Sequence, residues 1–266
     1  MRSVVLGEGP HTDVRVSELR AHGDVSFLSD DAGAHEAVAS SVANVVLLEH
    51  SGPRFFAIAA AAIRNGKHVL AAFPRALAAA DLRKLGSLAE EAGVRVSVVG
   101  ALRLLPSLQA ISIRRPRIVA IHATAGGGSG FLDRVVDCLD VCLSLVDTRD
   151  VQKVDAESVR AADGGFAVLG ASIRFQNGTL ALIHQDRGPG DIVVSVGGDQ
   201  GSKRIALVKD SIREESVAAA RLEVRNFLDG LTGSSDHAGG LQRAVQTMQL
   251  ADHVIMRMHR RSVVTV

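Results

Sequence analysis

The stretch Val4-Val5-Leu6-Gly7-Glu8-Gly9, near the amino terminus, decides how the first half of the chain folds. Three apolar residues indicate a short buried strand, and the two glycines that follow allow a tight turn into a helix. Thr12 or Asp13 can cap that helix, because a side-chain oxygen there accepts a hydrogen bond from a free backbone amide. Strand, glycine turn and helix in this order indicate an α/β fold.

The same alternation of apolar strand and Ala-rich helix continues through the first hundred residues. Four further strands are expected, at residues 25–28, 44–49, 68–71 and 94–99. Strands that are apolar along their whole length indicate a parallel sheet covered on both faces. We therefore predict a Rossmann-like doubly wound parallel sheet, forming a nucleotide-binding domain over residues 1–105.

Beyond residue 105 the pattern changes to longer strands. The dipeptide Asn177-Gly178 separates two strand-like runs, which is a strong signal for a hairpin. Helices are expected over residues 131–146, 213–231 and 238–259, and strands over residues 117–123, 166–176, 179–185, 192–196, 205–208 and 262–266. We predict that residues 106–266 form an α+β domain with an open antiparallel sheet, used for substrate binding and dimerisation.

The composition excludes several classes of function. The 266 residues are 47% hydrophobic and 3% aromatic, with no Trp or Tyr, so a stacking groove for single-stranded nucleic acid is not expected. A net charge of +1 gives no reason to expect binding to a phosphate backbone. Because the longest apolar run covers only residues 55–63, we expect a cytoplasmic protein that binds neither nucleic acid nor membrane. Cys138 and Cys142 are one helical turn apart and are expected to be reduced, buried thiols.

The pattern Gly7-x-Gly9-x-x-Thr12 approximates a dinucleotide-binding fingerprint. Asp30 follows the second strand, where a carboxylate can accept a hydrogen bond from a ribose hydroxyl. Pro10 removes one backbone donor from the turn. Two interpretations stay open: a site for NAD or NADP, or a tight turn without a ligand.

Three aspartates, Asp133, Asp137 and Asp140, share one helix face. Like charges at this spacing repel, so Asp137 and Asp140 need an arginine, a metal or water nearby. A solvated stripe, an active-site face and a metal site are the alternatives, and we assign no metal ligands because no histidine is within helical reach. His122 and His184, on strands before and after this helix, can point at the aspartates as catalytic groups or be structural.

Several segments resemble the Gfo/Idh/MocA (glucose–fructose oxidoreductase/inositol dehydrogenase) family. Gly66-Lys67-His68-Val69-Leu70, followed by Pro74, resembles the end of that family's nucleotide domain. Residues 127–133 resemble its glycine-rich entry to the catalytic helix, residues 173–178 its sheet hairpin and residues 198–202 a later tight turn. The resemblance covers most of the chain. It implies NAD or NADP as cofactor with Pro74 in that site, a small polyol, sugar or related metabolite as substrate, and a homodimer or higher oligomer through the open sheet.

The chain departs from the family's catalytic pattern at two places. Ala72-Phe73-Pro74 stands where the family has Glu-Lys-Pro, and Asp137 stands where it has the histidine that relays protons. The resemblance makes Asp133 the family's acid, and the segment between the second and third strands is shortened. We therefore expect an NAD(P)-dependent oxidoreductase-like protein with an altered catalytic site. The alternative is a non-redox member that acts as a partner subunit of another enzyme, or as a cofactor-independent lyase or cyclase.

Overall fold

The chain folds into two compact units. A computed structural model describes residues 1–9, 11–29, 33–49, 52–75, 77–125, 129–146, 148, 150–233 and 239–264. The first unit contains residues 1–101 and 216–246, and the second contains residues 102–215 and 247–266. Our sequence-based division assigned all of 106–266 to the second domain, whereas 216–246 pack into the first unit. Helical periodicity does not reveal which sheet an apolar face will cover.

The first unit is built on a parallel sheet of five strands in the order β2-β1-β3-β4-β5. The strands are β1 (Arg2–Leu6), β2 (Asp24–Leu28), β3 (Val45–Leu48), β4 (His68–Ala72) and β5 (Val96–Val99). Its helices are α1 (Thr12–Arg20), α2 (Ala34–Ser40), α3 (Phe55–Arg64), α4 (Ala79–Ala92) and the carboxyl part of α7 (Lys209–Leu231). The predicted Rossmann-like sheet is thereby confirmed.

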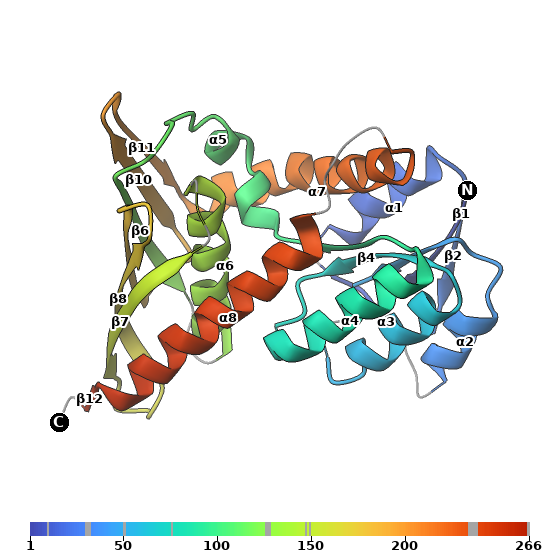
Figure 1. The fold of residues 1–266 in the computed structure, drawn as a ribbon, viewed down its shortest axis with the longest axis horizontal. Coiled ribbons are helices and arrows are strands. Elements are labelled where there is room, and N and C mark those ends of the chain that lie inside the picture. Colours follow the sequence, from blue (N-terminus) through green and yellow to red (C-terminus); the bar gives the residue numbers. More distant parts are fainter. Residues whose placement is uncertain are drawn as a thin grey trace. The chain divides into compact units, whose positions relative to one another are not determined.

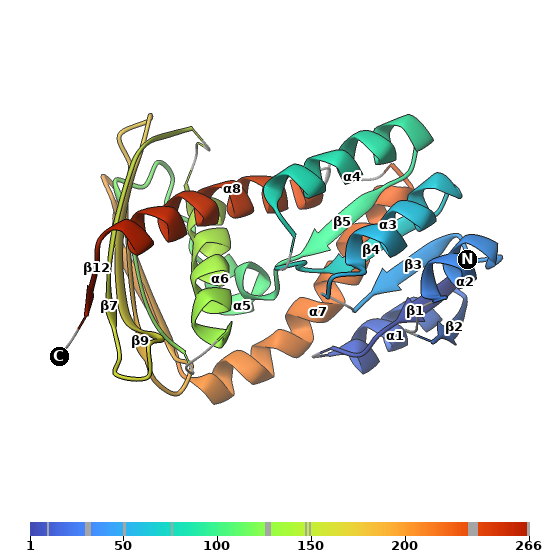
Figure 2. The same cartoon turned by 90° about the horizontal axis from the view of Figure 1, so that it is seen from below.

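Helices cover this sheet on both faces, with α1 and α7 on one side and α3 and α4 on the other (Figures 1 and 2). Val5, Leu47 and Leu70 on the strands pack with Leu19 of α1 and Phe227 of α7 in one buried cluster. Because the central strands are buried on both faces, their sequences are continuously apolar.

The second unit contains an open sheet of seven strands in the order β11-β10-β6-β9-β8-β7-β12. Most neighbouring pairs are antiparallel, but β6 pairs with β9 and β7 pairs with β12 in parallel. The strands are β6 (Ile118–Ala125), β7 (Val151–Arg160), β8 (Phe166–Phe175), β9 (Leu180–Arg187), β10 (Ile192–Gly198), β11 (Gly201–Leu207) and β12 (Ser262–Val264). The other elements are η1 (Ala101–Leu104), α5 (Pro106–Gln109), α6 (Ser129–Leu145) and α8 (Gly239–Arg260), which also contributes to the first unit.

The hairpin between β8 and β9 turns at Asn177-Gly178, as predicted, and Gly178 has a φ of 86°. Strand β7 is absent from our sequence-based assignment. Its residues include Gln152, Lys153, Asp155 and Glu157, so polar side chains hide the period-two pattern of a strand.

The two faces of the second sheet have different surroundings. Val119 and Ile121 of β6 and Ile183 of β9 are buried, and α6 lies on this face. The residues between them along each strand point to the opposite face, which has no helix from the described part of the chain over it (Figure 2). Among the described residues, none of the helices combines the length and apolar content that a membrane crossing needs.

Candidate functional site

The turn between β1 and α1 is shaped by Gly7 and closed by Thr12. Gly7 has a φ of 77°, a conformation that favours glycine. The amide of Gly9 donates to Oγ1 of Thr12 over 2.8 Å, and that hydroxyl donates to the carbonyl of Gly9 over 2.9 Å. Thr12 is the first residue of α1 rather than its cap, so the predicted cap by Thr12 or Asp13 is wrong. The Thr12 side chain closes the turn instead.

A carboxylate of the chain itself lies against this turn. Glu49 follows β3, and its side chain is only 1% exposed. A Cβ atom added to Gly9 would lie 2.8 Å from Oε2 of Glu49. The absence of a side chain at the second glycine of a dinucleotide fingerprint lets the pyrophosphate approach. Here the approaching group is the Glu49 carboxylate.

Arg15 of α1, in the same unit, is shared between this carboxylate and a second one. Its Nη1 lies 2.8 Å from Oε1 of Glu49, and its Nη2 lies 2.9 Å from Oε2 of Glu223 on α7. Burial alone lowers the pKa of Arg15, but the charges of Glu223 and Glu49 outweigh burial and hold that pKa above its usual value. Burial raises the pKa of Glu49, against the opposing effect of Arg15.

The candidate cofactor residues Gly7, Gly9 and Thr12 therefore form one closed turn, and an internal carboxylate lies against it. Sequence reasoning missed Arg15 and Glu49. The feature of the sequence that could have indicated Glu49 is its position directly after a fully apolar strand. Asp30, Pro10 and the glycines at 126–128 lie outside the described residues.

The three aspartates of α6 have different environments. Asp140 is buried, with Oδ2 2.8 Å from Nη1 of Arg103, and it accepts a hydrogen bond from Oγ1 of Thr247 over 3.3 Å. A solvated stripe is therefore the wrong description for Asp140, and of the three partners that the sequence left open, an arginine, a metal or water, the structure supplies an arginine, Arg103. Asp137 is partly buried and lies 3.8 Å from Nη1 of Arg134. Asp133, also partly buried, remains with Asp137 as a candidate for acid/base work.

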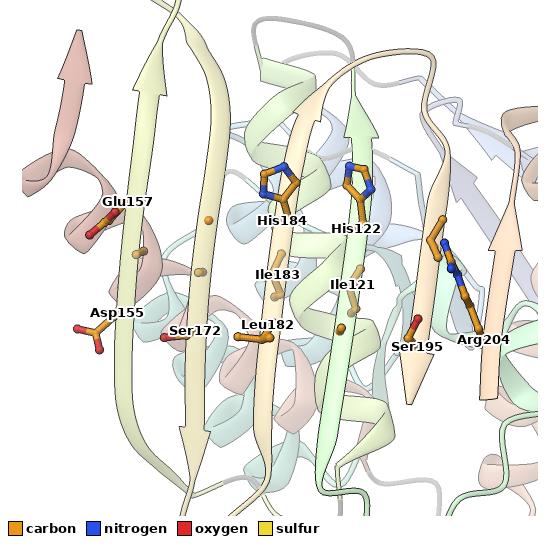
Figure 3. Close-up of a pocket in the computed structure, with 15 residues that line it drawn as sticks. Ile121, His122, Asp155, Glu157, Ser172, Leu182, Ile183, His184, Ser195 and Arg204 are labelled. Carbon is orange, nitrogen blue, oxygen red and sulfur yellow. The ribbon is translucent and has the colours of Figure 1, made fainter. Parts of the chain in front are cut away.

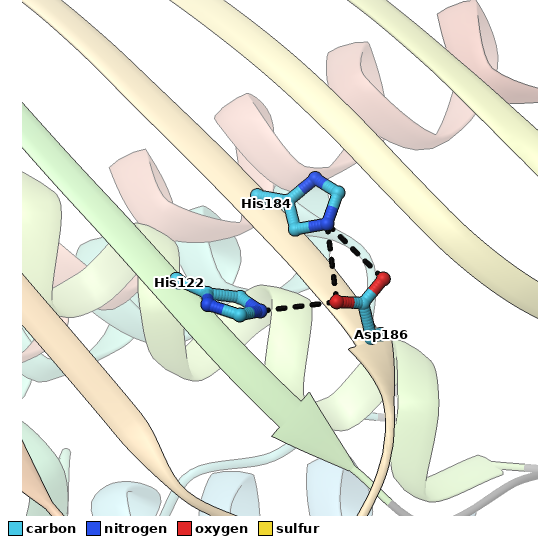
Figure 4. Close-up of side chains that lie close together, drawn as sticks. All are labelled: His122, His184 and Asp186. Atoms are coloured by element: carbon cyan, nitrogen blue, oxygen red, sulfur yellow. Dashed lines mark hydrogen bonds and ion pairs between the residues drawn. The ribbon is translucent and has the colours of Figure 1, made fainter.

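His122 and His184 do not point at these aspartates. Both lie on the open face of the sheet, whereas α6 packs against the opposite face (Figure 3). The expectation was wrong because neighbouring residues of a strand point to opposite faces, and the pattern did not say which face α6 would cover. The histidines instead meet Asp186 of β9, with Nε2 of His122 3.0 Å and Nε2 of His184 3.1 Å from its Oδ2 (Figure 4).

A hollow of about 550 Å³ lies on this open face. His122, His184 and Leu182 come from the two central strands β6 and β9, Asp155 and Glu157 of β7 are on one side, and Arg204 of β11 is on the other (Figure 3). The hollow belongs wholly to the second unit.

Solved structures match the chain over nearly its whole length. A biliverdin reductase from Synechocystis, in complex with biliverdin and NADP+, is 20% identical with a TM-score of 0.77, and the match covers 97% of this chain and 99% of that one. A scyllo-inositol dehydrogenase from Lactobacillus casei, with NAD(H) and scyllo-inositol, is 14% identical with a TM-score of 0.80 and 98% coverage of both chains.

The fold is that of the Gfo/Idh/MocA-type dehydrogenases. A myo-inositol dehydrogenase from Corynebacterium glutamicum shares it with a TM-score of 0.82 at 14% identity, over 98% of this chain and 97% of that one. No protein-family model matches the chain, and no curated protein matches its sequence.

Phe73 and Pro74 follow β4 of this Gfo/Idh/MocA fold, and both side chains are buried. The carbonyl of Pro74 accepts a hydrogen bond from the amide of Leu77 over 3.0 Å. An aromatic ring at 73 cannot donate a hydrogen bond as a lysine would. Lys67 is no substitute, because its Nζ donates to the carbonyls of Ser41 and Ala43.

Proposed function

We propose that this chain is an oxidoreductase-like protein that holds NAD or NADP at the β1–α1 turn and acts on a small polyol, sugar or related metabolite. The proposal is carried by the full-length Gfo/Idh/MocA fold, in which Gly7 and Gly9 precede the amino terminus of α1. Backbone amides at a helix amino terminus favour a phosphate. The neighbours with bound NADP+ and NAD(H) support this choice of cofactor.

The acid/base groups in this proposal are carboxylates. When bound, a nicotinamide ring exchanges a hydride with the substrate carbon. Asp133 or Asp137 takes the proton of the substrate hydroxyl, because the sequence has no tyrosine and position 73 carries phenylalanine. Pro74 and Thr12 shape the cofactor site.

The test is a fluorescence titration of the purified chain with NADH and NADPH. We expect saturable binding of one of them, and tighter binding by Glu49→Gln, which keeps the side-chain size and removes the charge that repels a pyrophosphate. Glu36→Gln, at an exposed glutamate of α2, is the matched control and leaves binding unchanged. Absence of saturable binding up to millimolar nucleotide, in the wild type and in Glu49→Gln, overturns the proposal.

A second candidate function is favoured by the Glu49 carboxylate beside Gly9. It is a non-redox protein, either a partner subunit of another enzyme or a lyase or cyclase that uses Asp133 and Asp137 without a cofactor. In this case neither the wild type nor Glu49→Gln binds nucleotide. A partner subunit co-purifies with another enzyme. A lyase or cyclase shows an activity that needs no cofactor and that Asp133→Asn abolishes. Hydride transfer in a turnover assay excludes it.

We also propose that a second copy of the chain covers the open face of the second-unit sheet. Ile118 and Leu182 expose 40% and 38% of their surface there, and burial of such side chains favours association. Glu157 and Arg204 lie toward opposite edges of the hollow, so a two-fold axis through its middle brings each near the other in the second copy.

The buried free thiols Cys138 and Cys142 support a cytoplasmic location.

A further inference from the structure

Three side chains converge on the open face of the second-unit sheet. Nε2 of His122 lies 3.0 Å from Oδ2 of Asp186, and Nε2 of His184 lies 3.1 Å from both carboxylate oxygens. The two imidazole rings have centroids 5.1 Å apart and are tilted by 59°. One potential ligand atom from each residue lies within 4.8 Å of the other two.

The two nitrogen-to-oxygen distances are those of ligands around one small cation. Zinc binds histidine nitrogen and carboxylate oxygen at about 2.0–2.2 Å, so two ligand atoms on one ion are about 3.0–3.5 Å apart. The two nitrogen-to-oxygen distances fall in this range. A cation between the three groups would take the place of the present contacts between the two imidazoles and the carboxylate.

The backbone holds the three residues in place before any ion arrives. His122 and His184 are direct partners in the parallel pairing of β6 and β9, and Asp186 follows two residues later on the same face. Both strands lie inside the seven-stranded sheet, with hydrogen-bonded neighbours on each side. On β8, the partner of His184 is Gly170, where an added Cβ would meet nothing within 4 Å. The cluster is therefore rigid at its base and has free space beside one imidazole.

We propose that His122, His184 and Asp186 bind one divalent transition-metal ion of the zinc class. Imidazole and carboxylate together suit zinc and its neighbours rather than calcium or magnesium. In the single chain these side chains are 51%, 52% and 34% exposed, so water can reach the remaining coordination positions when no second copy covers the face. One chain supplies all three ligands, and all three lie in the second unit, so the site needs neither a second copy nor the β1–α1 turn.

The experiment uses untagged full-length protein stripped with a chelator. Zn²⁺ is titrated against a chromophoric competitor, and Co²⁺ is added separately because its visible spectrum reports the ligand geometry. We expect one ion per chain, a visible band with Co²⁺ and a higher melting temperature with Zn²⁺. His122→Ala, His184→Ala and Asp186→Asn each weaken Zn²⁺ binding by at least about tenfold and abolish the melting shift.

The matched control is His35→Ala, which removes an exposed histidine that also lies beside a carboxylate, 3.9 Å from Glu36. It binds Zn²⁺ as the wild type does. Circular dichroism of each variant separates loss of a ligand from loss of the fold. Less than one ion per chain, or equal affinity in the wild type and a correctly folded His184→Ala variant, overturns the proposal.

Discussion

Nη1 of Arg15 lies 2.8 Å from Oε1 of Glu49, and this buried pair stands beside the glycine turn where the fold brings a pyrophosphate in dinucleotide-binding proteins. Arg15 also joins Glu223, so one guanidinium links α1, the end of β3 and α7. The arrangement stabilises the first unit and at the same time places negative charge at the proposed cofactor site. Stability and nucleotide affinity are therefore opposed at Glu49.

Replacing Arg15 by methionine should destabilise the protein strongly. The change leaves Glu49 and Glu223 buried without their cation, a loss of about 3–5 kcal/mol in the free energy of unfolding. Urea denaturation measures it. The control is Arg225→Met, which breaks the more exposed pair with Glu18 and should change the free energy of unfolding far less. Similar losses in the two variants would show that the Arg15 network is not the stabilising feature.

Asp140 and Asp137 should differ in their contribution to stability, since Asp140 has a structural role and Asp137 is a candidate for acid/base work. Asp140→Ala leaves Arg103 in a mostly buried place and should lower the free energy of unfolding by about 3–5 kcal/mol. Asp137→Ala breaks a longer contact with Arg134 and should cost about 1 kcal/mol or less. Thermal and urea denaturation of both variants test this difference, and a larger loss in Asp137→Ala contradicts it.

The two thiols should resist alkylation in the folded protein. Burial raises the pKa of both Cys138 and Cys142 to about 12, so almost no thiolate is present at pH 8. Unfolded cysteines ionise near pH 9, so the thiols favour the folded state below that pH and lose this contribution as the pH rises toward 12. Mass spectrometry after iodoacetamide treatment at pH 8, with and without urea, is the measurement. Rapid labelling without urea refutes the prediction.

Leu182→Glu should weaken self-association if a second copy covers the open sheet face. The substitution places a charge in the middle of an apolar contact and leaves the buried side of β9 unchanged. Light scattering during gel filtration gives the mass of each form. Val42→Glu, at another exposed apolar residue, is the control. A wild type that elutes as a monomer at high concentration removes the basis of the prediction.

Most of the strands and helices, but not β7, were predictable from the sequence alone. The apolar runs at β1, β3 and β4, the turn at Gly7 and Gly9 and the hairpin at Asn177-Gly178 are local patterns, because residue period and turn chemistry act over a few neighbours. The phenylalanine at position 73, the aspartate at position 137 and the absence of tyrosine are likewise visible without coordinates. Strand β7 escaped because its polar side chains mask the local pattern.

Only the tertiary structure decided which charged groups meet. Arg15 and Glu223 are separated by 208 positions in the sequence, and Asp140 and Arg103 by 37. The face on which His122 and His184 lie, and their contact with Asp186, depended on which side of the sheet α6 covers. The period-two pattern of a strand shows which residues share a face. Which of the two faces is buried depends on how distant segments pack against the strand. For that reason the sequence determined the scaffold, and long-range packing determined the chemistry placed on it.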